Sequence, residues 1–471
     1  MKSDAMTHPG KPEVYIRICD TYDRRRLTEI IGQGMEALGY VPKGKVYVKP
    51  NVVFAYNTKE FGSHAFTQPE FVGASLLALS RCKGVKRVDM GENSAMGFPT
   101  RLCYKHAGYY DQLKEIKKEA IHPVGMFCID EEPRDKVFVG GTVHDTLRLP
   151  KKMVRADSAV YLPKLKSHCV SQMTGAVKLN IGICSDDERA IRHDFLLNEK
   201  IVDLLSPGYP DFIVMDAIDV GVGNEAFPSP RKLGLVIMGT NPLAVDMVGA
   251  RLLGLSHVEV PYLKASVARG FTPASINEVT LSGDITSLAD LDSRAAMIFP
   301  YDEEFHRWQD VSTELERMNS PMRFMWGPCR SGHHNHCKTG CVMGLKMFLS
   351  AMEKFNGSHA FTSAKPVVFV IGDYETPIDA RGHEVFMLGS CSRATVTLAK
   401  KITRIDKCFT TAADMNLSIG HKLGMKSLTR DASFMRDFIT ALFQASFNKL
   451  ISGRYIQDVW HFITHGLLKR I

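Results

Sequence analysis

The sequence predicts an α/β protein with a largely parallel sheet and helices on both faces, plus a smaller C-terminal α/β metal-binding domain and a helical tail. Short runs rich in β-branched and aromatic residues alternate with helical stretches between Glu13 and about Leu255, and strands separated by helices usually form a parallel sheet. Two further strand-like runs, at 365–373 and 384–391, follow a cysteine-rich segment at 327–344 and predict the smaller domain.

The elements of the first domain are expected in a regular order. Strands are expected at 13–19, 45–51, 85–90, 157–163, 211–217 and 232–238, and helices at 23–38 and 69–82. Gly39 ends the first of these helices, because glycine favours the conformation that closes a helix. In open sheets of this kind ligands bind at the carboxyl ends of the strands. We therefore expect a binding site where these strands end.

The chain of 471 residues is longer than one hydrophobic core usually supports, so we expect more than one domain. The predicted division is 1–283 for the α/β domain, 284–324 for a helical connector, 325–430 for a cysteine-rich α/β domain and 431–471 for an amphipathic tail. Apolar residues recur at helical spacing in the tail, which predicts a helix that docks on a partner, forms a homodimer or lies on a membrane surface.

Composition excludes several classes of protein. A hydrophobic share of 45 % and a charged share of 23 % are ordinary for a soluble globular protein, and no apolar run is long enough to cross a membrane. The net charge of +8 favours an anionic ligand, acidic partner or lipid, but no Lys/Arg stripe indicates nucleic-acid binding. Eleven cysteines without a visible secretory signal predict a reducing compartment, so the expected location is the cytoplasm.

Basic and amide side chains gather where predicted strands end. Lys49 and Asn51 follow one strand, and the segment PKLKSH follows another, so both groups are expected to face one crevice. Such donors suit a carboxylate or a phosphate. The residues that we expect to act on the substrate are Lys49, Lys166, His168 and Lys178. Those that we expect to bind it are Asn51, Lys164, Thr174, Gly175, Asn180, Arg192, His193, Asp216 and Asp246.

Structural roles compete with these functional ones. The lysines could cap strands, the histidines could be satisfied core residues, and Arg192 could pair with neighbouring acids instead of clamping an anion. Asp216 and Asp246 could bind a metal, act as general bases or serve as internal counter-ions. Neither GxGxxG nor the phosphate-binding pattern GxxxxGK[ST] occurs, so no motif supports nucleotide binding.

Several blocks together resemble a known family. KVYVKPNVV, YLPKLKSH, TGAVKLNIGI, VMDAID and NPLAVDMVGARLLG occur in this order over about residues 45–255, and the order resembles the family called domain of unknown function 362. The resemblance implies an α/β fold and, in many members, ferredoxin-like cysteine runs of the form CxxCxxCxxxC. This chain contains no CxxC, so the resemblance does not supply a ferredoxin module.

The cysteine-rich segment predicts a metal site. Cys329, Cys337 and Cys341 lie within thirteen positions, with three histidines among them. Thiolates so close repel one another unless they are protonated, paired or bound to a cation. Cys391 or Cys408 could supply a fourth ligand. All-thiolate ligation suits an iron–sulfur cluster, most simply 4Fe–4S, whereas one histidine ligand favours zinc; three buried thiols without a metal are the remaining alternative.

These observations predict an iron–sulfur-linked redox enzyme or electron-transfer protein that acts on a small anionic substrate. Such a protein needs an electron-transfer partner. One alternative is a non-redox lyase, isomerase or hydrolase with structural zinc. Another is a non-catalytic binding or assembly factor whose tail docks a partner. The sequence supplies no nucleophile with an adjacent base that would fix a reaction class.

Overall fold

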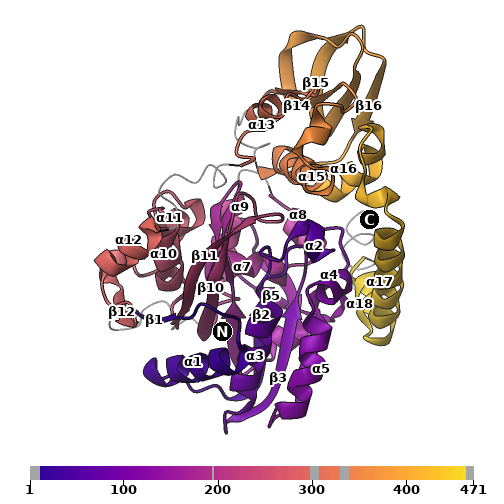
Figure 1. Ribbon diagram of the computed structural model, residues 1–471. Helices are drawn as coiled ribbons and strands as arrows, with labels where there is room; N and C mark the ends of the chain where they lie inside the picture. The colour runs from indigo at the N-terminus through magenta and orange to yellow at the C-terminus, as the bar shows by residue number, and fades with distance from the viewer. Residues whose placement is uncertain (1–10, 194–195, 298–306, 329–338, 463–471) are drawn as a thin grey trace.

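A computed structural model describes residues 11–193, 196–297, 307–328 and 339–462. Its strands form a ten-stranded large sheet, a four-stranded small sheet and a two-stranded hairpin. Figure 1 shows the small sheet and its helices at one end of the large one, with the C-terminal helices alongside the large-sheet region. The described part of the chain contains no helix of the length and apolarity that a membrane crossing requires.

The large sheet has the order β12-β1-β11-β10-β7-β2-β3-β4, and β8 and β9 extend from β10. The bounds of these strands are β1 (Glu13–Ile18), β2 (Gly44–Pro50), β3 (Val85–Glu92), β4 (Val124–Cys128), β7 (Ser158–Leu162), β8 (Lys164–His168), β9 (Gln172–Thr174), β10 (Phe212–Val222), β11 (Ser229–Gly239) and β12 (Thr280–Gly283). Neighbours are parallel except at β1–β11, β10–β11 and β8–β9. The predicted, largely parallel sheet is confirmed. β10 and β11 are antiparallel because only a short loop, 223–228, joins them.

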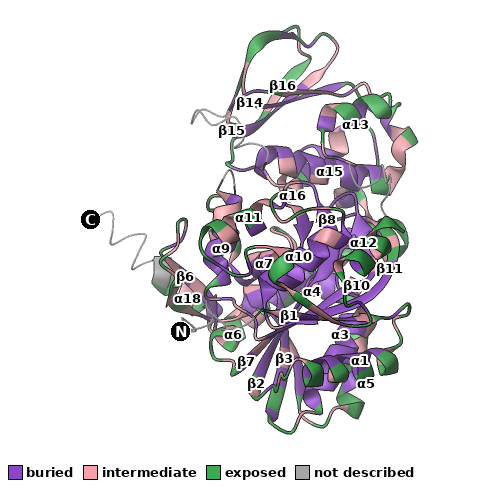
Figure 2. Cartoon of the chain, turned by 90° about the vertical axis from the view of Figure 1, so that its left-hand side faces the viewer, coloured by how far each residue is buried: buried purple, intermediate pink, exposed green. Residues whose placement is uncertain are grey.

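Helices cover both faces of the large sheet, as predicted. One face carries α1 (Arg24–Ala37), α3 (Pro69–Ser80), α4 (Thr100–His106) and α5 (Tyr109–Glu119), and the other carries α7 (Ala176–Leu179), α9 (Leu197–Leu205), α10 (Pro242–Leu252), α11 (Pro261–Ala268) and α12 (Leu288–Ala296). Val46 and Val48 pack into one core, whereas Tyr47 packs into the other. Neighbouring residues of a strand point to opposite faces, so both faces of the sheet are covered and the central strands β7 and β10 are almost wholly buried (Figure 2).

The small sheet contains β13 (Arg323–Trp326), β14 (Val367–Asp379), β15 (Glu384–Thr397) and β16 (Lys401–Ile405), all parallel. It packs with α13 (Val311–Arg317), α15 (Cys341–Asn356) and α16 (Ala412–Ser418) around a core that includes Leu345, Phe348 and Phe369. Trp326, Ile371, Leu388 and Ile405 pair in one row across the four strands. β13 and β16 end at this row, which we call the edge of the small sheet, whereas β14 and β15 continue beyond it with a shifted register.

The C-terminal tail forms α17 (Ala432–Ile451) and α18 (Arg454–Phe462). Phe434 and Phe438 of α17 pack beside Phe98, at centroid distances of 6.4 Å each. Gln457 of α18 exchanges two hydrogen bonds with the backbone of Arg134, at the start of the hairpin β5 (Arg134–Phe138) and β6 (Thr146–Pro150). The tail is therefore fixed along the side of the large sheet.

Candidate functional site

A cavity of about 200 Å³ lies between the large sheet and the helices α15 and α16. Its wall on the side of the large sheet includes Asn51 beyond β2, Thr174 at the end of β9 and Lys178 on α7. Its other wall includes Met343 and Met347 of α15. Strand ends and loops from segments far apart in the sequence therefore meet at one place.

Lys178 is the least satisfied charged group of the cavity wall. Its side chain is half-buried, and no hydrogen bond or ion pair joins it to another residue within 11–193, 196–297, 307–328 or 339–462. Burial lowers the pKa of the Lys178 ammonium to about 8, although Glu225 and Cys169 oppose this effect. An ammonium without a partner in a cavity can bind an anion or transfer a proton near neutral pH.

Asp246 fixes the turn that carries Lys178. The carboxylate of Asp246 accepts hydrogen bonds from the backbone N–H groups of Ala176 and Val177, at 2.6 and 3.0 Å, and from the Tyr262 hydroxyl at 3.3 Å. A Cβ at Gly175 would lie 2.2 Å from Asp246 Oδ1. Gly175 is thus required for this close approach. Asp246 therefore acts as a positioning residue for α7, and burial raises the pKa of its carboxyl group to about 7.

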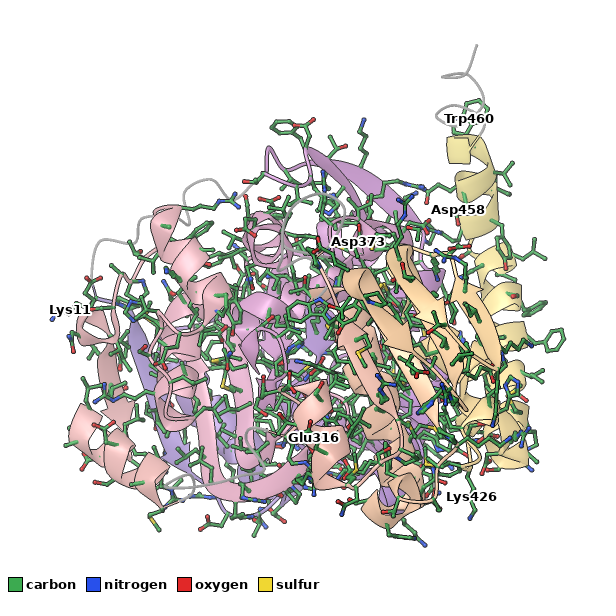
Figure 3. The ribbon with its side chains drawn as sticks, turned by 90° about the horizontal axis from the view of Figure 1, so that it is seen from above. Lys11, Glu316, Asp373, Lys426, Asp458 and Trp460 are labelled. Atoms are coloured by element: carbon green, nitrogen blue, oxygen red, sulfur yellow. The ribbon has the colours of Figure 1, made fainter. Side chains whose placement is uncertain are left out.

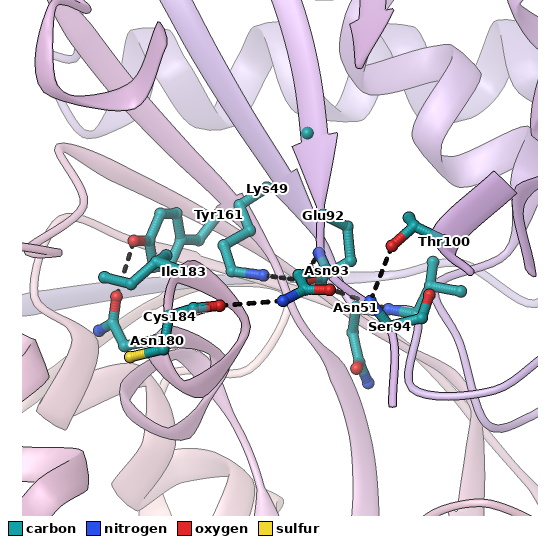
Figure 4. A network of polar contacts seen from close by, with 12 residues as sticks. Lys49, Asn51, Glu92, Asn93, Ser94, Thr100, Tyr161, Asn180, Ile183 and Cys184 are labelled. Atoms are coloured by element: carbon teal, nitrogen blue, oxygen red, sulfur yellow. Dashed lines mark hydrogen bonds and ion pairs between the residues drawn. The ribbon is translucent and has the colours of Figure 1, made fainter. Parts of the chain in front are cut away.

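Other donors at the cavity also lack partners among the described residues. They are Asn51 Nδ2, Thr174 Oγ1 and Arg189 Nε, and each of these three residues is at least nine-tenths buried. In Figure 4 no hydrogen bond is drawn to the side-chain amide of Asn51. Arg189 uses its terminal nitrogens to bond the backbone carbonyls of Asn93 and Ser94. Buried donors usually find acceptors, so this set favours an anionic ligand.

His168 and Glu225 form a polar pair that lines the cavity. His168 Nδ1 accepts hydrogen bonds from the backbone N–H groups of Val170 and Ser171, at 3.1 and 3.2 Å. Burial holds the pKa of His168 well below its usual range, so the ring is neutral and its proton is on Nε2, 3.3 Å from Glu225 Oε1. His168, Cys169 and Glu225 could by distance hold a metal ion. This tautomer disfavours such a site, because a metal on Nε2 would place the proton on Nδ1, facing two N–H donors.

The other predicted lysine of this wall has its hydrogen bonds satisfied. Lys166 donates to the backbone carbonyls of Ala65 and Glu225, at 2.5 and 2.6 Å. Burial holds the pKa of its ammonium well below the usual range. Lys166 therefore links the loop 223–228, which contains Glu225, to the backbone at Ala65. It also lines the cavity.

Lys49 forms a buried ion pair with Glu92 at the end of β3 (Figure 4). Burial lowers the pKa of Lys49 and raises that of Glu92, while the attraction between the two groups opposes both shifts. A Cβ on Gly182 would lie 2.2 Å from Glu92 Oε1 and 2.5 Å from Lys49 Nζ. Glu92 lines the cavity, whereas Lys49 lies behind it.

Three of the predicted metal ligands lie near the edge of the small sheet. Cys391 and Cys408 each follow, by three positions, a residue of the row that pairs Trp326, Ile371, Leu388 and Ile405. A Cβ on Gly389 would lie 3.0 Å from Cys341 Sγ and 3.9 Å from Cys391 Sγ, so these two sulfurs face the same point. Cys329 and Cys337 lie outside the described residues, and Cys329 follows Trp326 by the same three positions.

Cys341, Cys391 and Cys408 together form what we call the cysteine edge, and this edge adjoins the cavity. The backbone N–H of Thr410 donates a hydrogen bond of 3.3 Å to Cys341 Sγ. The preceding residue, Phe409, lines the cavity and stacks on His193 with a centroid distance of 5.2 Å. Met343 and Gly344, in the first turn of α15 after Cys341, also line the cavity. Two consecutive residues, Thr410 and Phe409, thus join the cysteine edge to the cavity wall.

A family model described as Domain of unknown function (DUF362) matches residues 46–251. This segment, which is less than half of the chain, is similar to the DUF362 family, and we call it the DUF362 domain. The matched residues include all those that line the cavity on the side of the large sheet, from Asn51 to Phe227. The cysteine edge lies beyond it in the sequence, so the cavity is built from the DUF362 domain and the C-terminal region together.

A thylakoid-associated protein of Synechocystis sp. (strain ATCC 27184 / PCC 6803 / Kazusa) is 26 % identical over 242 residues, which are 50 % of this chain and 70 % of the relative. The solved structures that match include the following two. The lactate racemase apoprotein from Thermoanaerobacterium thermosaccharolyticum is 12 % identical, with a TM-score of 0.30, over 53 % of this chain and 58 % of that protein. A protein from Thermotoga maritima is 13 % identical, with a TM-score of 0.30, over 54 % of this chain and 60 % of that protein. The chain thus spans less than two thirds of each solved structure.

Several residues predicted to bind substrate lie elsewhere in the DUF362 domain. The Lys164 ammonium and the Asp216 carboxylate form a fully buried ion pair of 2.9 Å, completed by the Tyr22 hydroxyl. Asn180 accepts a hydrogen bond of 2.7 Å from the Tyr161 hydroxyl, and Arg192 is exposed; none of these residues lines the cavity. The segment expected as a loop at 163–168 is itself the strand β8, which explains why Lys164 points into the core.

The sequence did not single out Glu92 or the apolar part of the cavity wall. β3 extends two residues beyond the predicted end of its strand, to Glu92, and these residues gave no motif. Phe54, Phe98 and Phe227 of the DUF362 domain meet the wall formed by α15. No signal in the sequence indicated what the apolar face of α15 would contact.

Proposed function

We propose that this chain is a redox protein in which cysteines at the edge of the small sheet hold an iron–sulfur cluster, next to a small anionic substrate in the cavity. The single observation that carries the proposal is the bridge from Cys341 through Thr410 and Phe409 to His193. Only two residues, Thr410 and Phe409, separate the proposed cluster ligand Cys341 from the cavity that carries the unpartnered donors. Electron transfer between a cluster and a substrate needs such proximity.

The donor set fits a cluster. The proposed ligands are Cys341, Cys391 and Cys408, with Cys329 or Cys337 from outside the described residues. Thiolates are the usual ligands of iron–sulfur clusters, and N–H groups that donate to the sulfurs tune the reduction potential, as Thr410 would at Cys341. Irregular spacing does not exclude ligation, because separate strands bring Cys391 and Cys408 to one edge.

The residues of the chain have separate roles in this proposal. Lys178, Asn51 and Thr174 bind the anionic oxygens, and Asp246 holds the turn that carries Lys178. Met343, Met347 and Phe409 exclude water from the substrate. The cluster, when bound, supplies single electrons, which a partner protein with a one-electron carrier would deliver. Lys178 is the nearest candidate proton donor, because its pKa lies near neutrality.

Metal analysis of protein purified without air tests the proposal. We expect a broad absorbance band near about 400 nm that dithionite bleaches, with matching amounts of iron and sulfide. Cys341→Ser should remove most of the iron, whereas Cys82→Ser, at a half-buried thiol of the DUF362 domain, should retain it. Colourless protein with about one zinc would contradict the redox proposal and favour a lyase, isomerase or hydrolase with a structural metal.

We also infer that the tail attaches the protein to a membrane surface. Phe434, Ala441 and Ala445 of α17 face the body, whereas Phe443 and Phe447 are 73 % and 63 % exposed. α18 continues this apolar surface with Ile456 and Trp460, at 71 % and 68 % exposed, and Trp460 lies far from both sheets (Figure 3). Helices that bury an aromatic face in the lipid interface have this pattern.

The charge of the chain and the name of one relative favour a lipid surface, and not a second copy of the protein, as what covers the exposed apolar side chains of the tail. The net charge of +8 attracts anionic headgroups, and Arg436 is exposed on α17. The printed name of the Synechocystis relative describes that protein as thylakoid-associated. Tryptophan and phenylalanine near basic residues are typical of interfacial helices.

Co-sedimentation with vesicles of phosphatidylglycerol and of phosphatidylcholine tests the attachment. The unchanged protein should bind the anionic vesicles, and the double variant Phe443→Ser, Phe447→Ser should lose most of this binding. Val258→Ser, at an exposed residue of the large-sheet region, is the matched control and should bind normally. If light scattering shows dimers and the protein does not bind vesicles, the exposed apolar side chains of α17 and α18 would instead form a homodimer interface.

A further inference from the structure

We infer that the cavity binds an amphiphilic anion, in which a single aromatic ring or a branched alkyl group carries one carboxylate or phosphate. The inference rests on the anion site proposed above and adds the class of ligand. Its basis is the difference between the donors of the DUF362 domain and the face of α15 opposite them. The DUF362 domain offers unpartnered donors, whereas α15 contributes only apolar side chains; the polar residues Thr411 and Asn416 of the same side belong to the α16 region.

The donors all belong to the DUF362 domain. Lys178, Asn51 Nδ2, Thr174 Oγ1 and Arg189 Nε have no partner among the residues that the structure describes. The carboxylates of this wall do not compensate for them, because Glu92 is paired with Lys49 and Glu225 receives the Nε2 proton of His168. An anionic group placed here would meet several donors at once.

The contribution of α15 to the cavity is apolar throughout. This helix presents Met343, Met347 and Ala351 at intervals of four, and Gly344 three positions before Met347, so these residues share one face. Phe54 continues the apolar surface beside it, at centroid distances of 5.3 Å from both Phe98 and Phe227. A free phosphate or acetate would leave this surface in contact with water, whereas a ring would cover it.

Volume and side-chain type limit the size of the apolar group. The volume of about 200 Å³ is somewhat larger than the volume of about 150 Å³ of an apolar cavity that binds benzene, which suits one ring with its anionic group. Methionine side chains adapt their shape and make favourable contacts with aromatic rings. Met343 and Met347 can therefore close on a flat ring that the donors hold by its charge.

Calorimetric titration of the full-length protein with benzoate, phenyl phosphate, acetate and inorganic phosphate tests the inference. We expect each aryl anion to bind about tenfold or more tightly than its small counterpart, since one buried ring contributes at least that factor. Met347→Gln should remove most of the preference for the ring and leave acetate and phosphate unchanged. Met297→Gln, at a 75 % exposed methionine, should change neither.

The outcomes separate this inference from the proposed function. Equal affinities for benzoate and acetate would overturn the amphiphilic ligand while leaving the anion site in place. Absence of binding by all four anions would overturn both. Lys178→Met should weaken all four anions together, which assigns binding to this cavity. The ligand series on the unchanged protein decides the question even where a variant does not fold.

Discussion

Asp246 Oδ1 lies 2.6 Å from the backbone nitrogen of Ala176, and this hydrogen bond reaches across 70 positions of the sequence. It fixes the turn from which Lys178 enters the cavity. The contact is close enough that only glycine fits at position 175, where a Cβ would lie 2.2 Å from the carboxylate. The position of the cavity lysine therefore depends on a residue that does not line the cavity.

Gly175→Ala should separate Asp246 from α7. We expect a loss of about 1–3 kcal/mol in the free energy of unfolding, typical of overpacking, together with weaker anion binding. Urea unfolding and calorimetric titration measure the two effects. Gly32→Ala is the matched control, because its Cβ would meet nothing within 4 Å in helix α1. That control should stabilise the protein by up to about 1 kcal/mol, and a similar result for Gly175→Ala would refute the close approach.

Anion affinity should fall as the pH rises through about 8. The pKa of Lys178 is lowered to about 8 by burial, with Arg189 acting in the same direction and Glu225 and Cys169 opposing it. The charged ammonium binds an anion and the neutral amine does not, so affinity is highest below this pKa and is lost above it. Titrations with benzoate between about pH 6 and 10 measure the effect.

The matched variant for the pH profile is Lys178→Arg. A guanidinium stays charged throughout this range, so any binding that remains in Lys178→Arg should not fall near pH 8. Lys178→Met should show weak binding at every pH. A profile in the unchanged protein that stays flat up to about pH 10 would show that another cation holds the anion.

Glu92→Gln should destabilise the protein strongly. The side chain of Lys49 is fully buried, and removal of the carboxylate leaves its ammonium without a counter-charge. We expect a loss of about 3–5 kcal/mol in chemical unfolding experiments. The double variant Lys49→Met, Glu92→Gln should recover most of this loss, because it leaves no buried charge unpaired. Equal stability of the single and double variants would contradict a direct pairing.

Cys391→Ser and Cys408→Ser should each lower the iron content of anaerobically purified protein. Both residues follow the same paired row of the small sheet by three positions, so both sulfurs are placed to bind one cluster. Iron, sulfide and visible absorbance give the measurement, and circular dichroism verifies the fold. Full iron content in Cys408→Ser, with loss in Cys391→Ser, would instead assign two ligands, Cys329 and Cys337, to the segment outside the described residues.

Much of the architecture was predictable from local pattern. Val46 and Val48 alternate with Tyr47, but all three are apolar, and such a run indicates a strand buried on both faces of a helix-covered sheet. Lys178 and Asn51 were predicted as functional because donors follow strand ends. The same rule named Lys164, which instead pairs with Asp216, since position along a strand does not reveal whether a nearby acid neutralises a lysine.

The sequence by itself determined the α/β class, the family resemblance of residues 46–251 and the chemical types of the cavity donors, because these follow from periodicity and from ordered local blocks. Tertiary structure decided which donors lack partners, how Asp246 positions α7 and how Phe409 comes to lie between Cys341 and the cavity. The register of Trp326, Ile371, Leu388 and Ile405, which aligns the cysteines, was decided in the same way. The physical reason is that pairing between strands and burial of charge depend on contacts between residues far apart in the chain, which no local pattern encodes.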